Sequence, residues 1–105
     1  MGLDNNVLSL GEYLRKLREV KNLTLKSVSD NLKIDTSLLA KIERNERAVS
    51  KELIKKLSSF FLCDEKLLTN IYLSDFIANK ILDEEADLSI LKIVERKVKY
   101  HNKTK

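Results

Sequence analysis

Proline is absent from the 105-residue chain, and only two glycines are present. Both residue types interrupt helices, so their scarcity, together with abundant Leu, Lys, Glu and Ile, predicts an all-α protein. A single cysteine excludes a disulfide framework and gives no basis for a metal cluster. No apolar run approaches the roughly 20 residues that a membrane-spanning helix needs.

Features of catalytic sites are also missing. No glycine-rich phosphate loop is present, and His101, the one histidine, has no nucleophile near it in the sequence. The acids at 83–85 lack the spacing of a calcium loop and instead favour the start of a following helix. We therefore expect no enzyme, no metal and no cofactor. The start of the chain, residues 1–7, lacks both a signal-peptide apolar stretch and a myristoylation serine or threonine, so we expect a cytoplasmic protein with no membrane partner.

The net charge of +4 is concentrated in one part of the chain. Residues 1–63 hold twelve Lys or Arg and eight Asp or Glu, whereas residues 64–105 hold eight of each kind. A phosphate-binding surface needs such an excess, but any lysine-rich helical protein has cationic faces. The charge distribution is therefore compatible with a nucleic acid partner without selecting it.

The stretch 24–44 has the pattern of two short helices joined by a tight turn. Thr24 and Asp35 can each cap a helix. Two apolar residues mark the buried side of each helix: Val28 and Leu32 in the first, Leu39 and Ile42 in the second. The second helix leaves a face that is small, polar or cationic: Thr36, Ser37, Ala40, Lys41 and Arg44. A B-DNA major groove admits a helix with such a face.

Several short segments within residues 10–68 occur in a characteristic order: Leu14-Arg15-Lys16-Leu17-Arg18, Leu23-Thr24, Ile34-Asp35, Leu39 and Lys41-Ile42-Glu43-Arg44. In this combination they resemble the Cro/repressor family of helix-turn-helix DNA-binding domains, which includes phage repressors and many small bacterial regulators. The resemblance implies a five-helix DNA-binding domain, which we assign to residues 1–68. Residues 69–105 then form a C-terminal helical extension, consisting of the rest of a long fifth helix and a sixth helix.

The resemblance implies where the second helix of the motif contacts bases. The matching positions are Thr36, Ser37, Ala40 and Lys41. Lys41 is the expected source of a guanine preference, and the hydroxyls of Thr36 and Ser37 can donate or accept hydrogen bonds. The alternative for these two hydroxyls is support of the helix start. Leu38 either meets thymine methyl groups or completes the core.

Four cations are expected to contact phosphates. Arg44 and Arg47 lie in or beside the polar loop that follows the motif, and Lys51 is close to the same loop. Lys26 can meet a phosphate together with the first amides of its helix. The alternative for the two arginines is an ordinary solvated loop.

The resemblance also implies an ion pair between Arg18 and Glu43 that fixes the angle between two helices. The chain departs from the family at three positions. Leu25 replaces a frequent glutamine, and both Lys33 and Asn45 stand where glycine is common. At Lys33 either the turn geometry differs or the backbone is strained.

From Leu67 onward, apolar residues at helical spacing continue to Leu82, and Leu88–Val98 predicts a last helix with a wide apolar arc. We expect these elements to form a helical hairpin covered by a second copy of the chain, because one small core cannot cover so much apolar surface. The expected interface residues are Leu68, Ile71, Tyr72, Phe76, Leu91, Val94 and Val98. In the alternative, the last helix folds back on its own domain.

These features predict a homodimeric, sequence-specific transcriptional regulator that binds double-stranded DNA at a near-palindromic operator, with no small-molecule ligand. A controller of a restriction-modification operon, a phage-type repressor and an autorepressing antitoxin all fit this size. The alternative is a protein-interaction module that uses residues 67–98 to bind a different protein, such as a toxin. Binding of DNA by the purified protein separates the two.

Overall fold

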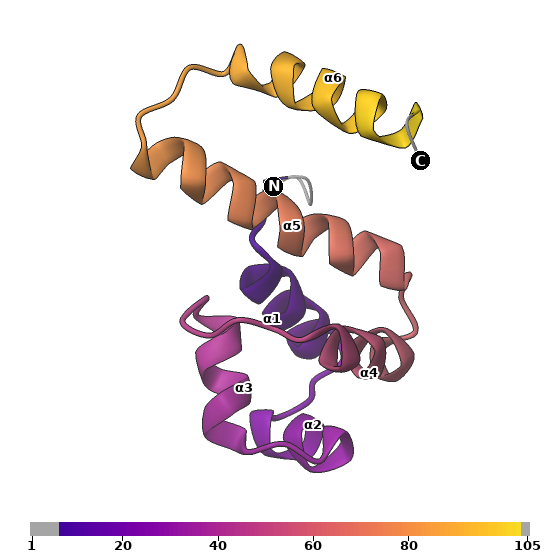
Figure 1. Ribbon diagram of the computed structural model, residues 1–105. Helices are drawn as coiled ribbons and strands as arrows, with labels where there is room; N and C mark the ends of the chain where they lie inside the picture. The colour runs from indigo at the N-terminus through magenta and orange to yellow at the C-terminus, as the bar shows by residue number, and fades with distance from the viewer. Residues whose placement is uncertain (1–6, 104–105) are drawn as a thin grey trace. The chain divides into compact units, whose positions relative to one another are not determined.

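The computed structural model describes residues 7–103, which form six helices and no strand (Figure 1). The helices are α1 (Leu10–Val20), α2 (Leu25–Leu32), α3 (Thr36–Glu43), α4 (Lys51–Phe61), α5 (Glu65–Asp83) and α6 (Ile90–Lys103). The predicted all-α class is confirmed. The expectation that the chain starts without a leader sequence concerns residues 1–7. Of these, residues 1–6 lie outside the described range. No helix within that range is long and apolar enough to cross a bilayer.

Hydroxyl caps start three of the helices where the sequence predicts them. Ser9 caps α1, Thr24 caps α2 and Ser50 caps α4. In each case the side-chain oxygen accepts a hydrogen bond from the backbone N–H three residues later, at 3.2, 3.0 and 3.1 Å. Asp35 occupies the N-cap position of α3, but its carboxylate makes no capping hydrogen bond. The expected side-chain cap of α3 is therefore absent.

Two further contacts at the start of α1 come from distant parts of the chain. The Leu10 N–H donates to Oδ2 of Asp75 in α5 at 2.8 Å, and the Gly11 N–H donates to Oδ1 of Asn45 at 3.0 Å. The first amides of a helix have no partner within the helix, so these side chains satisfy groups that would otherwise need water. They also tie α5 and the loop after α3 to α1.

The core is apolar and receives side chains from α1 through α5. Leu68 and Ile71 of α5 belong to it, with exposed fractions of 0% and 8%. We expected both residues at a subunit interface, and this prediction was wrong, because the first part of α5 covers the bundle of its own chain. The compact unit accordingly extends to Asp75, beyond the boundary expected at Leu68, and a second unit begins at Phe76.

Among residues 7–103, five residues other than glycine adopt a left-handed backbone: Asn22, Lys33, Asn45, Leu62 and Glu85. Lys33, with φ of 59°, ends α2. The turn therefore keeps the geometry that glycine usually supplies, and of the two alternatives stated for Lys33, the strained backbone is the correct one. A side chain with a Cβ in this region costs about 1 kcal/mol.

The second unit comprises the end of α5 from Phe76 onward and α6. No residue of α6 is buried. Its apolar residues Leu91, Val94 and Val98 are spaced three and four apart, so they lie on one side of the helix, and their exposed fractions are 44%, 42% and 54%. Phe76 is also exposed. Taken by itself, this unit thus leaves these apolar side chains exposed.

Candidate nucleic-acid interface

The face of α3 opposite the core is polar and accessible. The four residues expected to contact bases lie on it: Thr36, Ser37, Ala40 and Lys41. Ala40 is partly exposed and the other three are exposed. On the other side of the helix, Leu39 and Ile42 are almost fully buried. Burial of these two residues fixes the rotation of α3 about its axis, and the polar face is held outward as a consequence.

Leu38 does not belong to the exposed face. It is partly buried and packs against the core. Of its two alternatives, completion of the core is therefore the one that the structure supports. α2 and α3 are joined by the short turn at residues 33–35, and they form the helix-turn-helix pair of the domain (Figure 1).

A two-pronged ion pair connects the end of α3 to α1. Arg18 donates from Nε to Oε2 of Glu43 at 2.8 Å and from Nη2 to Oε1 at 3.0 Å. Its Nη1 also donates to the carbonyl of Leu23 at 2.9 Å. Both side chains are largely buried, with 13% and 6% exposed. The hydrogen bonds with Glu43 raise the pKa of the Arg18 guanidinium, so the arginine stays charged and holds the angle of α3 against α1.

The four cations expected to contact phosphates are all exposed: Lys26, Arg44, Arg47 and Lys51. Two of them have acidic neighbours. Arg44 pairs with Glu46 at 2.9 Å and Lys26 pairs with Asp30 at 3.3 Å. Pairs this exposed contribute little free energy, so a phosphate can replace either carboxylate. Arg47 and Lys51 form no ion pair within residues 7–103.

One residue that the sequence analysis did not single out supports the polar face of α3 from below. Ser29 of α2 is fully buried, and its Oγ lies 2.8 Å from Oγ1 of Thr36 and 3.1 Å from the carbonyl oxygen of Lys26. The spacing alone could have placed Ser29 on the buried side, because it lies next to Val28 and three residues before Leu32. Its partner Thr36 could not have been found in this way.

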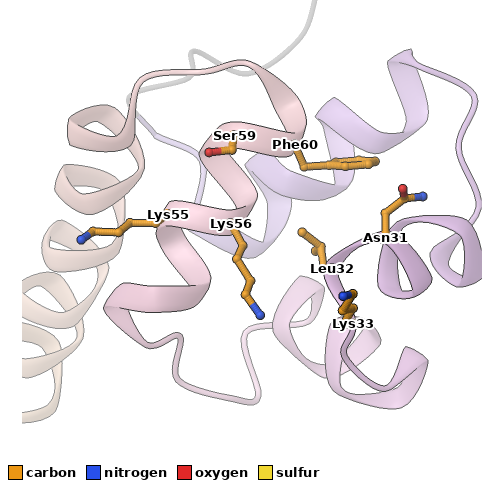
Figure 2. Close-up of a pocket in the computed structure, with 7 residues that line it drawn as sticks. All are labelled: Asn31, Leu32, Lys33, Lys55, Lys56, Ser59 and Phe60. Carbon is orange, nitrogen blue, oxygen red and sulfur yellow. The ribbon is translucent and has the colours of Figure 1, made fainter.

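A second cationic feature lies between the end of α2 and α4. A groove of about 630 Å³ is open to solvent there (Figure 2). Its lining residues are Asn31, Leu32, Lys33, Lys55, Lys56, Ser59 and Phe60. Figure 2 shows Lys55 pointing away from most of the other lining residues. None of the four candidate base contacts lines this groove, so it is separate from the polar face of α3.

Comparison with known proteins gives the family. A model of the helix-turn-helix family matches residues 14–68, just over half of the chain. The restriction-modification controller protein C.AhdI from Aeromonas hydrophila is 30% identical, with a TM-score of 0.53 over 56% of this chain and 89% of that one. The clp gene regulator ClgR from Corynebacterium glutamicum shares the fold, with a TM-score of 0.55, 18% identity and 84% and 88% of the two chains covered. No curated protein matches the sequence. The chain belongs to the helix-turn-helix family of DNA-binding transcriptional regulators.

Proposed function

We propose that this protein is a homodimeric regulator that binds a near-palindromic operator, with the two copies of α3 in successive major grooves. The observation that carries the proposal is the polar face of α3, which is kept accessible by the burial of Leu39 and Ile42. Two recognition helices related by a two-fold axis require half-sites about one helical turn, roughly 34 Å, apart. The protein would act in the cytoplasm on double-stranded DNA, without a small-molecule ligand.

Within this proposal the two sets of side chains have different roles. Thr36, Ser37, Ala40 and Lys41 contact base edges and determine the sequence, whereas Lys26, Arg44, Arg47 and Lys51 contact phosphates and supply most of the affinity. Binding measured against salt concentration, on a selected site and on random DNA, tests this division. We expect Lys41→Ala to relax the preference at one base position by about 1–3 kcal/mol. Arg47→Ala is the matched change, and it should weaken binding to both DNAs alike and lower the salt dependence.

The assignment of Lys41 depends on the difference between the two DNAs. If Lys41→Ala weakens binding to the selected site and to random DNA equally, Lys41 is a phosphate contact. If wild-type protein selects no sequence from a random pool, the regulator proposal fails as a whole.

The second unit supports the homodimer. Phe76, Leu91, Val94 and Val98, four of the seven residues expected at the interface, are exposed. Exposed apolar side chains grouped on a helix commonly mark an interaction site, and most small oligomers are two-fold symmetric. The alternative, in which the last helix folds back on its own domain, predicts a monomer.

Light scattering on wild-type protein and two variants tests the dimer. Val94→Asp places a charge within the apolar side of α6, and Asn102→Asp adds the same charge at an exposed polar position of the same helix. We expect a dimer for wild type and for Asn102→Asp, and a monomer for Val94→Asp. A wild-type monomer that forms a complex with a different protein would instead support the interaction module that uses residues 67–98.

Among the possible roles, the 30% identity to C.AhdI favours a restriction-modification controller over a phage repressor or an antitoxin. A controller is expected to bind upstream of its own gene, beside genes for a nuclease and a methyltransferase. Footprinting on that upstream DNA and inspection of the neighbouring genes test this role.

A further inference from the structure

The hydroxyl groups of Ser29 and Thr36 form a short chain of hydrogen bonds that ends on a backbone carbonyl. Ser29 Oγ lies within hydrogen-bond distance of both the Lys26 carbonyl oxygen and Oγ1 of Thr36. Because Ser29 is fully buried, water does not replace either partner. The structure gives the Ser29 hydroxyl as the donor to the Lys26 carbonyl oxygen, at 3.1 Å.

The number of protons fixes the direction of both bonds. A carbonyl oxygen only accepts, so the single hydroxyl proton of Ser29 is donated to Lys26. Ser29 then has only lone pairs for its second partner, and Thr36 must donate its own proton to Ser29. The Thr36 oxygen, which belongs to an exposed residue, keeps its lone pairs but has no proton left for a ligand.

The base edges of the major groove differ in what they offer to such an oxygen. Adenine N6 and cytosine N4 carry donor amino groups, whereas guanine O6 and N7 and thymine O4 are acceptors. An oxygen that can only accept will bond the amino bases and will face a lone pair on the keto bases. A freely rotating hydroxyl would bond either kind.

We propose that Thr36 is a fixed hydrogen-bond acceptor that selects an amino base, adenine or cytosine, on the DNA strand it faces. Ser29 is the positioning residue that sets this polarity from the interior. The inference rests on the proposed binding of DNA by α3. Ser37, the next residue on the same face, has no such bond within the described residues, so its hydroxyl can rotate and imposes no polarity of this kind.

Selection of binding sites from a random duplex pool by the full-length protein tests the proposal. For wild type we expect one position at which adenine and cytosine are preferred over guanine and thymine by about 3- to 10-fold, the worth of one hydrogen bond. Thr36→Val keeps the shape of the side chain without its hydroxyl, and should remove the preference at that position alone. Ser37→Ala is the matched control and should leave that position unchanged.

Ser29→Ala tests whether Ser29 makes the Thr36 hydroxyl an acceptor, because it leaves Thr36 itself in place. Without Ser29, the Thr36 hydroxyl regains its proton, so guanine and thymine should be accepted at the same position to within about 2-fold of adenine and cytosine. Affinity for random DNA should not change, since no phosphate contact is touched. Thermal melting of this variant reports whether the buried substitution preserves the fold, and the Thr36→Val result stands without it.

Three outcomes overturn the inference while leaving the regulator proposal intact. The first is that the position altered by Thr36→Val prefers guanine or thymine in wild type. The second is that Thr36→Val alters no position although other positions are selected. The third is that folded Ser29→Ala keeps the wild-type preference for amino bases. Absence of any selected sequence with wild-type protein would overturn both proposals together.

Discussion

At the scale of single residues, burial separates two ion pairs of the same chemistry. Arg15 and Glu19 pair at 3.2 Å on the surface of α1, with more than half of each side chain exposed. Arg18 and Glu43 pair at 2.8 Å with 13% and 6% exposed, and the arginine has a second partner in a backbone carbonyl. Loss of one partner from the buried pair leaves an uncompensated charge, whereas loss from the exposed pair leaves a hydrated one.

We therefore expect Glu43→Ala to lower the free energy of unfolding by about 3–5 kcal/mol. Glu19→Ala, the matched control, should lower it by about 0.5 kcal/mol or less, as for exposed helix pairs. Urea denaturation at neutral pH measures both values. Equal losses for the two variants would mean that the pair between α1 and α3 is not a structural link.

The sequence was sufficient to predict some of these residue contacts but not others. The Arg18–Glu43 pair follows a family pattern, because each residue occupies a recognisable position of a motif. The hydrogen bond between Ser29 and Thr36 depends on the angle and distance at which α2 packs against α3. The spacing of residues within one helix does not predict this packing. The same limit applies to Asp35, where the residue type allows a cap and the side-chain orientation does not provide it.

At the scale of elements, close approach of α1 and the end of α3 requires glycine at one position. A Cβ added to Gly11 would lie 2.5 Å from the carbonyl oxygen of Ile42 and 2.6 Å from that of Glu43. Oδ1 of Asn45 would also lie at 2.6 Å, and this atom accepts the Gly11 N–H. Two of the three obstructing atoms are backbone, so a change of rotamer cannot relieve the contact.

Gly11→Ala should therefore displace the end of α3 or strain α1, at a cost of about 2–3 kcal/mol in the free energy of unfolding. Affinity for specific DNA should fall as well, because α3, the helix that we propose to enter the major groove, changes its angle. Lys16→Ala is the matched control on an exposed position of α1 and should change stability by about 0.5 kcal/mol at most. Denaturant unfolding and DNA titration measure the two effects. A wild-type melting curve for Gly11→Ala would show that the two helices can separate freely.

The residues at which helices start are easier to predict than the part of the protein that covers each apolar helix face. A capping hydroxyl and its amide are three residues apart, so the signal is contained in a short segment, as at Ser9 and Ser50. Periodicity, in contrast, identifies which side of a helix is apolar without identifying what covers it. For Leu68 the cover is the core of its own chain and not a second subunit.

At the scale of the whole molecule, the chain divides within α5. The unit that ends at Asp75 contains all the buried apolar residues of the described chain, from Leu8 to Ile71. The unit that begins at Phe76 contains none of them. The buried core that folding requires therefore lies in the first segment, and the dimer surface that we propose lies in the second. A shortened chain that keeps the whole first unit should fold, and one that ends inside it should not fold as well.

We expect residues 1–75 to unfold cooperatively, with a melting temperature close to that of the full-length protein at low concentration, where dimerisation contributes little. Residues 1–68 lack Ile71, which is buried in the core, and Asp75, which accepts the Leu10 N–H. Loss of one buried aliphatic side chain and one charge-assisted hydrogen bond should reduce the free energy of unfolding by at least about 3 kcal/mol.

Circular dichroism melting of the two shortened chains makes the comparison. Because both lack the apolar surface of α6, both should be monomeric, so a difference between them cannot come from dimerisation. If the two shortened chains are equally stable, the DNA-binding domain ends at Leu68, as the sequence predicts, and not at Asp75.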